Sequence, residues 1–141
     1  MSDVIVTSTG KLRNEVRLSD GQSLTIDEPA SLGGDGAGPN PYDLLLVALG
    51  GCISMTVTLY ARRKGWPLEG VRVELRQGRI HSEDCAECEQ STERFIHRIE
   101  RRITIEGELT QEQHARLQEI AHKCPVHKTL SSEIMITEMK D

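Results

Sequence analysis

The sequence predicts an α+β protein in which antiparallel sheets surround one long central helix. Short alternating segments fill the first thirty residues, and an uncharged, helix-forming segment follows them. Two more alternating segments then precede a second helix, an order typical of α+β folds. At 141 residues, the chain is expected to form one domain over 1–141, with a single hydrophobic core.

Three strands are expected before the helix. The segments VIVTST at 4–9, NEVRLS at 14–19 and QSLTIDE at 22–28 are rich in β-branched residues or alternate between apolar and polar residues. Asp20-Gly21 lies between the last two segments and is typical of a hairpin turn.

The central helix is predicted to begin at the end of the glycine-rich segment SLGGDGAGPNP at 31–41. Asn40 suits the N-cap, Pro41 suits the first helical position, and Asp43 lies where a capping-box acid is found. The helix is expected to end near Lys64, since Gly65 and a proline follow.

Residues 44–61 carry no charge, which raises the alternative of a membrane span. Gly50 and Gly51 weaken the centre of the segment, three hydroxyl residues dilute its second half, and no aromatic belt follows. A helix that is apolar on every side is otherwise typical of a protein core or an oligomer interface. We therefore expect no membrane insertion, and a homodimer that shares this helix.

The second half of the chain is expected to add two strands, a helix and a last strand. VRVELRQGRI at 71–80 and FIHRIERRITIEGEL at 95–109 contain the two strands, with a polar loop between them. Thr110 and Gln113 form a capping box that begins the second helix, which Pro125 closes or kinks. EIMITEM at 133–139 is predicted to be the final strand. One apolar face of the second helix is formed by Leu117, Ile120, Ala121 and Cys124.

Composition narrows the functional classes. A formal net charge of −5 argues against a nucleic-acid partner held through its phosphates. The N-terminus lacks the pattern of a signal peptide, so a cytoplasmic location is expected. In a reducing cytosol, the four cysteines indicate catalysis or metal binding rather than structural disulfides.

Cys52 and Cys124 lie on the two predicted helices and are either small core residues or reactive thiols. A thiolate is stabilised near a helix N-terminus and opposed near a C-terminus. Cys124, near the predicted C-terminus, is therefore the better resolving thiol. Cys52, in the middle of its helix, is the better nucleophile, but it needs a cation from elsewhere, most plausibly an arginine.

The remaining cysteines, Cys85 and Cys88, lie in the acidic loop, flanked by His81 and His97. This spacing has the ingredients of a metal site but matches no zinc module, so a solvent-exposed loop is the first interpretation, with a structural metal or a redox pair as alternatives. A second metal candidate, spaced H-x-C-x2-H, is formed by His122, Cys124 and His127.

Two longer segments resemble the signatures of the OsmC/Ohr family, the osmotically induced protein C and organic hydroperoxide resistance proteins. They are DEPASLGGDGAGPNPYDLLLVALGGCISMTVTLYARRKGWPLEGV at 27–71 and GELTQEQHARLQEIAHKCPVHKTL at 107–130. The resemblance implies an intertwined α+β homodimer that reduces organic hydroperoxides without a cofactor, using an external dithiol as reductant. It also implies that Cys52 is the peroxidatic cysteine and that Cys124 resolves it as a disulfide.

The sequence departs from the family pattern at one position. Peroxidases of the family carry a glutamate ten residues before the cysteine, and it holds an arginine from near the N-terminus. Here that position is Tyr42, followed by Asp43, which either replaces the glutamate or only caps the helix. Arg13 and Arg17 are the two candidates for the arginine. NPYDLLL resembles a branch of the family labelled redox or disulfide regulators.

Three functions follow from the sequence. The first is a cysteine-based peroxidase for organic hydroperoxides. The second is a non-peroxidatic protein of the same fold that binds a small apolar ligand at the dimer interface. The third is a protein that holds a metal at the cysteine-containing loop.

Overall fold

The computed structural model describes residues 3–81 and 95–140, and the chain divides into two compact units, Met1–Leu45 and Leu46–Asp141. The α+β class with antiparallel sheets is confirmed, since a three-stranded and a two-stranded sheet accompany one long helix. The single domain over the whole chain stays a prediction.

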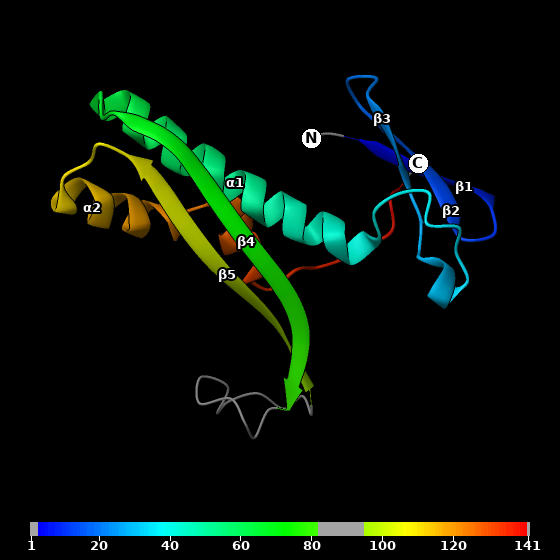
Figure 1. Ribbon diagram of the computed structural model, residues 1–141. Coiled ribbons are helices and arrows are strands. Elements are labelled where there is room, and N and C mark those ends of the chain that lie inside the picture. The colour runs from blue at the N-terminus through cyan, green and yellow to red at the C-terminus, as the bar shows by residue number, and fades with distance from the viewer. Residues whose placement is uncertain (1–2, 82–94, 141) are drawn as a thin grey trace. The chain divides into compact units, whose positions relative to one another are not determined.

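The first unit holds the three-stranded antiparallel sheet, formed by β1 (Val4–Gly10), β2 (Arg13–Leu18) and β3 (Ser23–Ile26) (Figure 1). The predicted turn at Asp20-Gly21 joins β2 to β3. The backbone N–H of Gln22 donates to the Asp20 carboxylate at 3.1 Å. Gly21 has a φ of 89°, which glycine adopts without steric cost. The local prediction is therefore confirmed.

The glycine-rich loop after β3 folds around one buried carboxylate and contains a short 3-10 helix, η1 (Ala30–Leu32). Asp27, 2 % exposed, accepts hydrogen bonds from the backbone N–H groups of Glu28 at 2.8 Å and of Asp35 and Ala37 at 3.1 Å. The bond from Ala37 does most to lower the pKa of Asp27; burial opposes this effect, and the other two bonds reinforce it. This carboxylate fixes the loop that leads into the helix.

The long helix α1 (Pro41–Lys64) begins as the sequence predicts. The Asp43 N–H donates to Asn40 Oδ1 at 2.8 Å, and the Asn40 N–H donates to Asp43 Oδ2 at 3.3 Å. This reciprocal pair satisfies two backbone donors that a helix start otherwise leaves open. Asp43 therefore caps the helix.

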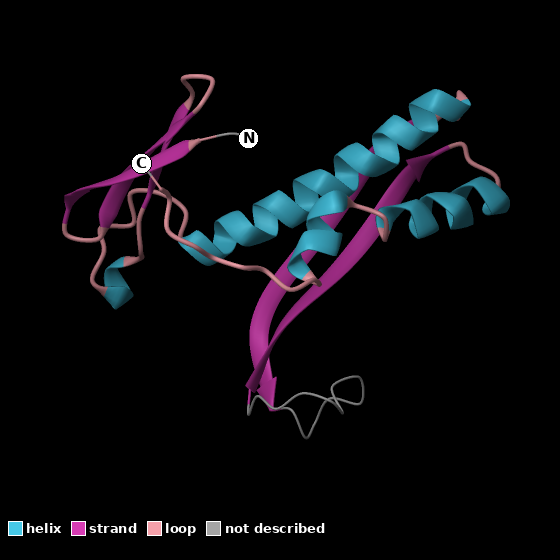
Figure 2. Cartoon of the chain, turned by 180° about the vertical axis from the view of Figure 1, so that it is seen from behind, coloured by secondary structure: helices cyan, strands magenta, loops and turns pink. Residues whose placement is uncertain are grey.

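The second unit is built on a long antiparallel hairpin, β4 (Leu68–His81) and β5 (Phe95–Gly107), with α1, α2 (Gln111–Ala121) and α3 (Pro125–Leu130) over one of its faces (Figure 2). Side chains alternate between the two faces of the hairpin. The face away from the helices carries ion pairs, with Arg76 at 3.0 Å from Glu100 and Arg102 at 3.4 Å from Glu74.

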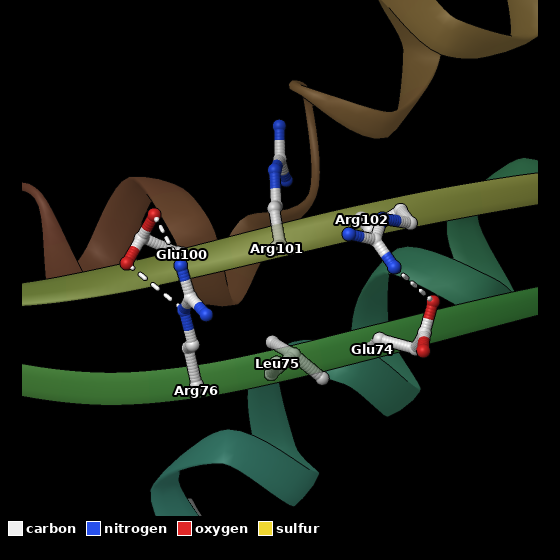
Figure 3. A pocket seen from close by; sticks show the side chains of 6 residues that line it. All are labelled: Glu74, Leu75, Arg76, Glu100, Arg101 and Arg102. Carbon is white, nitrogen blue, oxygen red and sulfur yellow. Dashed lines mark hydrogen bonds and ion pairs between the residues drawn. The ribbon is translucent and has the colours of Figure 1, made fainter.

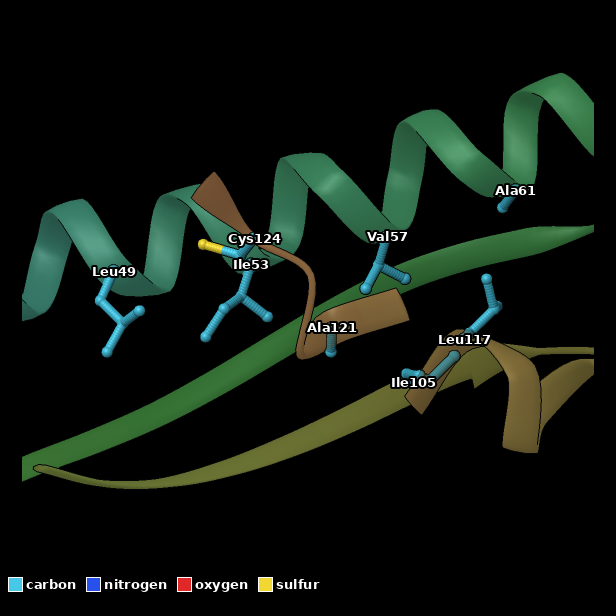
Figure 4. Close-up of a cluster of buried hydrophobic side chains, with 8 residues drawn as sticks. All are labelled: Leu49, Ile53, Val57, Ala61, Ile105, Leu117, Ala121 and Cys124. Carbon is cyan, nitrogen blue, oxygen red and sulfur yellow. The ribbon is translucent and has the colours of Figure 1, made fainter. Parts of the chain in front are cut away.

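The core of the second unit lies between α1 and the hairpin and is closed by α2 (Figure 4). Four apolar residues of α1 are buried in this core. They recur at every fourth position, which places them along one face of the helix. The buried cluster consists of Leu49, Ile53, Val57, Ala61, Ile105, Leu117, Ala121 and Cys124.

α1 is long and apolar enough to cross a membrane by length and composition, with a mean hydropathy of 2.0 over its most apolar window. Its buried row belongs to the core of the second unit, so α1 is a core helix of this fold. Its opposite side is exposed and apolar. Val47, Met55 and Leu59 are 64 %, 67 % and 55 % exposed.

Two predicted elements differ in the structure. The segment 133–139 forms no strand, and Ile136 is 92 % exposed. A strand needs a partner edge, and among the described residues none pairs with this segment. The second helix ends at Ala121 and a separate helix begins at Pro125, because proline cannot continue the hydrogen-bond ladder. The predicted capping box of Thr110 and Gln113 is confirmed.

Candidate functional site

The first candidate thiol, Cys52, projects from the interior of α1 and is half-buried. Its sulfur lies 3.9 Å from Thr56 Oγ1, one turn further along the helix. The i, i+4 spacing places both side chains on one side of the helix, so the hydroxyl is available as a hydrogen-bond donor to the sulfur.

The second thiol, Cys124, lies between α2 and α3 and is fully buried in the core (Figure 4). It is the N-cap of α3, and its sulfur accepts a hydrogen bond from the His127 N–H at 3.4 Å. Cys124 thus lies just past the C-terminus of α2, as predicted, but it also starts α3, which was not predicted. The sequence shows that Pro125 interrupts the helix, but not that the chain turns before the proline and starts a new helix there.

The two thiols interact, although they are far apart in the sequence. Burial opposes ionisation of Cys52, but hydrogen bonds from the Cys124 thiol, the Val126 N–H and Thr56 together lower the pKa of Cys52. Burial raises the pKa of Cys124, and its contact with Cys52 raises that pKa further. Of the two thiols, Cys52 therefore ionises more readily, and Cys124 donates a hydrogen bond to it. Both are free in the structure.

A cation from β5 lies beside this pair. Arg101 donates to the Ala121 carbonyl at 3.4 Å through one guanidinium nitrogen, and another lies 2.7 Å from His122 Nδ1. Burial lowers the pKa of Arg101, and attraction to Cys124 opposes that effect. Arg101 thus lies within electrostatic reach of the Cys124 thiol.

A cavity of about 250 Å³ adjoins this group. Its wall is partly apolar and partly basic, because Arg101 and two histidines meet three aliphatic side chains there. Burial, together with the charges of Arg101 and His122, lowers the pKa of His127. The lining residues are Leu49, His97, Ile99, Arg101, His127, Leu130 and Ser131.

The glycines before Cys52 have two different environments. A Cβ on Gly50 would lie 2.7 Å from Leu75 Cδ1, so this glycine lets β4 pack closely on α1. A Cβ on Gly51 would meet nothing within 4 Å. The space that the missing side chain of Gly50 leaves is thus filled by a strand residue, whereas the space beside Gly51 is open.

Three other predicted site residues belong to the first unit. Arg13 and Arg17 lie on β2 of the first unit, and Asp43 is engaged in the cap of α1. The activating role given to each of these three residues stays a prediction. The sequence reasoning missed Arg101. The available signal was an arginine at an apolar position of β5, between Ile99 and Ile103.

The metal candidates find little support in the described part of the chain. Cys85 and Cys88 lie outside the described residues, and His81 is described only as the end of β4. His97 lines the cavity. Among residues 3–81 and 95–140, no group of three or more histidine, cysteine or acidic side chains is arranged to hold a metal ion.

Comparison with known proteins supplies the family. The OsmC-like protein family matches residues 33–139, which is most of the chain. The comparison with curated proteins gave no match.

Solved structures share the fold at low identity. An organic hydroperoxide resistance protein OsmC from Legionella pneumophila has a TM-score of 0.66 and 21 % identity, over 93 % of this chain and 89 % of that one. An organic hydroperoxide resistance protein from Elizabethkingia anophelis has a TM-score of 0.65 and 19 % identity, over 93 % and 88 %. An OsmC-like protein of unknown function from Vibrio cholerae has a TM-score of 0.70 and 14 % identity, over 94 % and 95 %. The fold and the family match agree, and the chain belongs to the OsmC-like family.

Proposed function

We propose that this protein is a thiol peroxidase that reduces organic hydroperoxides, with Cys52 as the peroxidatic cysteine and Cys124 as the resolving cysteine. The observation that carries the proposal is the contact between these two thiols, which pairs a lowered pKa with a raised one. A thiolate is the attacking species, so the thiol that ionises more readily takes the first step.

The reaction then runs in three balanced steps. The Cys52 thiolate attacks the terminal oxygen of ROOH and the O–O bond breaks. Cys52 becomes a sulfenic acid, and the alkoxide that leaves takes up a proton from solvent as ROH. Cys124 attacks the Cys52 sulfur, a disulfide forms and water leaves. An external dithiol reduces the disulfide by exchange and is itself oxidised.

The preference for organic peroxides is supported by the surroundings of the thiols. Leu49 and Ile53 of α1 lie in the same buried cluster as Cys124 (Figure 4). An apolar wall favours an alkyl substituent over the well-hydrated hydrogen peroxide molecule. Two of the structural relatives are organic hydroperoxide resistance proteins, and the Legionella protein is also described as a predicted redox protein and regulator of sulfide bond formation.

A cytoplasmic homodimer is part of the proposal. The exposed side of α1 presents three large apolar side chains, which a monomer would leave in water. A second copy that packs its own α1 on this side would bury them symmetrically. The reductant would be a cytosolic dithiol.

A second candidate is a protein that binds a small apolar ligand at the dimer interface without turning over peroxide. It is favoured by one observation. The cavity of about 250 Å³ has three aliphatic side chains in its wall, from Leu49, Ile99 and Leu130, which suit an apolar ligand.

The experiment uses the reduced full-length protein with one equivalent of cumene hydroperoxide. Peroxide loss is followed with time and disulfides are mapped by mass spectrometry, with Cys52→Ser and Cys124→Ser as matched variants. The peroxidase predicts rapid peroxide loss, a Cys52–Cys124 disulfide, no reaction in Cys52→Ser, and a sulfenic acid that persists in Cys124→Ser. If the peroxide survives while both thiols stay reduced, the ligand-binding function is the correct one.

A further inference from the structure

Arg101 occupies an unusual position on the hairpin. It faces Leu75 across the ladder, and the inward-facing residues that follow it on β5, Ile103 and Ile105, are aliphatic. Its neighbours Glu100 and Arg102 point to the other face and pair with β4, as Figure 3 shows. Within residues 3–81 and 95–140, no ion pair joins Arg101 to a carboxylate.

The hydrogen bonds of Arg101 converge on the turn that carries the resolving cysteine. Its guanidinium donates to the Ala121 carbonyl, the last residue of α2, and contacts His122, the C-cap of that helix. Cys124 follows two residues later. The arginine therefore holds the α2 end of the turn while the His127 N–H holds the sulfur from the α3 side.

Arg101 brings a permanent positive charge to the surroundings of Cys124. The titratable groups around Cys124 are Cys52 from α1, Arg101 from β5, His122 from the end of α2 and His127 from α3. A lowered pKa leaves His127 neutral at physiological pH. A guanidinium stays protonated throughout.

We propose that Arg101 is a positioning residue for the resolving step, which holds the Cys124 turn against α1 and offsets the negative charge of the Cys124 thiolate as it attacks the oxidised Cys52. This inference rests on the proposed function. In that step the Cys124–Cys52 S–S bond forms, the S–O bond of the sulfenic acid breaks, and the hydroxide that leaves takes up a proton as water.

Oxidation of Cys52 changes what Cys124 experiences. In the reduced protein, burial raises the pKa of Cys124 most, and competition with Cys52 for the negative charge raises it further. A neutral sulfenic acid removes this competition, while Arg101 and the His127 N–H stay in place. Arg101 thus acts after the first oxidation and has little influence on the attack on peroxide.

The test uses Arg101→Gln, which removes the charge, and Arg101→Lys, which keeps it. Arg102→Gln is the matched control, since Arg102 is the next residue of β5 but faces the opposite side and pairs with Glu74. Two rates are followed after one equivalent of cumene hydroperoxide: trapping of the Cys52 sulfenic acid by dimedone, and formation of the Cys52–Cys124 disulfide. We expect Arg101→Gln to keep the first rate and to lower the second about tenfold, with partial rescue in Arg101→Lys and no change in Arg102→Gln.

A second measurement needs no peroxide. In a Cys52→Ser background, Cys124 is the only thiol of the pair. Its alkylation rate at neutral pH, measured as fluctuations of the fold admit a small reagent, reports how readily Cys124 ionises. Arg101→Gln should lower this rate about fivefold, whereas Arg101→Lys should not, and circular dichroism checks that each variant is folded. Equal alkylation rates in Arg101→Gln and Arg102→Gln would overturn the inference. If wild-type protein leaves peroxide intact but the alkylation rates differ as expected, the proposed peroxidase fails and the electrostatic role of Arg101 stands.

Discussion

At the scale of single residues, the thiol pair is asymmetric because each cysteine has a different set of donors. Cys52 accepts from three donors, while Cys124 is buried and donates to it. The helix that carries Cys52 does not itself favour a thiolate, since a mid-helix position lies outside the first turn, where the dipole acts. The lowered pKa of Cys52 is thus due to hydrogen bonds from Cys124, Val126 and Thr56, and not to the helix dipole.

Cys124→Ala should therefore raise the pKa of Cys52 and slow its reaction with iodoacetamide at neutral pH, about two- to fivefold, because a hydrogen bond to the thiolate is lost. Cys124→Ser keeps a hydroxyl donor and should slow the reaction less. The rates are measured by quenched alkylation and mass spectrometry. An equal loss in both variants would mean that burial, and not the donor, sets the reactivity of Cys52.

Gly50 and Gly51 provide a second comparison between adjacent residues. Gly50→Ala places a methyl group against Leu75, and the overpacking should make it less stable than Gly51→Ala by about 1–2 kcal/mol. Gly51→Ala should be neutral or stabilising, since alanine favours the helix by up to about 1 kcal/mol. Urea unfolding of the two variants measures the difference, and the reverse order would contradict the close packing of β4 on α1.

At the scale of elements, the loop before α1 depends on the ionised form of Asp27. Its folded pKa lies below the ordinary value, so the stabilisation is complete above the unfolded pKa and is lost as the pH falls through the folded pKa. Asp27→Asn should lower the free energy of unfolding at neutral pH and flatten its decline in acid. Urea unfolding from about pH 6 to pH 2 measures this, with the exposed Asp3→Asn as control, which should behave as wild type.

Local signals in the sequence predict elements well where the determining contacts are local. The caps at Asn40 and Thr110 and the turn at Asp20-Gly21 involve residues two or three positions apart, and all three are present. The new helix that begins after Cys124 was not predicted, because its start depends on where α2 ends before the proline, and packing decides that.

Arg101 could not be identified from the sequence for a related reason. Its position in the alternation of β5 shows that it faces inward, but not what lies opposite. That neighbour is the end of α2, which lies 20 residues further along the chain. The prediction of a final strand at 133–139 was wrong for a similar reason. An alternating sequence allows a segment to pair, but a strand forms only where the fold offers an edge to pair with.

At the scale of the whole molecule, the exposed apolar side of α1 is the feature that bears on assembly. If two copies share it, Met55→Glu should weaken the dimer, because a charge would be buried without a partner. Light scattering after size-exclusion chromatography should then show mainly monomer. Arg63→Glu also introduces a glutamate on α1, outside the apolar side, and should stay dimeric. A monomeric wild-type protein would show that this side of α1 has another role.

The sulfur of Cys124 has two tasks, since it caps α3 and also enters the disulfide. A disulfide sulfur carries less negative charge than a thiol or thiolate, so it is a weaker acceptor for the His127 N–H. Oxidation should therefore loosen the first turn of α3, and the His127 amide should exchange with solvent faster in the oxidised protein than in the reduced one. The exchange rate of this single amide would then report whether the thiol pair is reduced or oxidised.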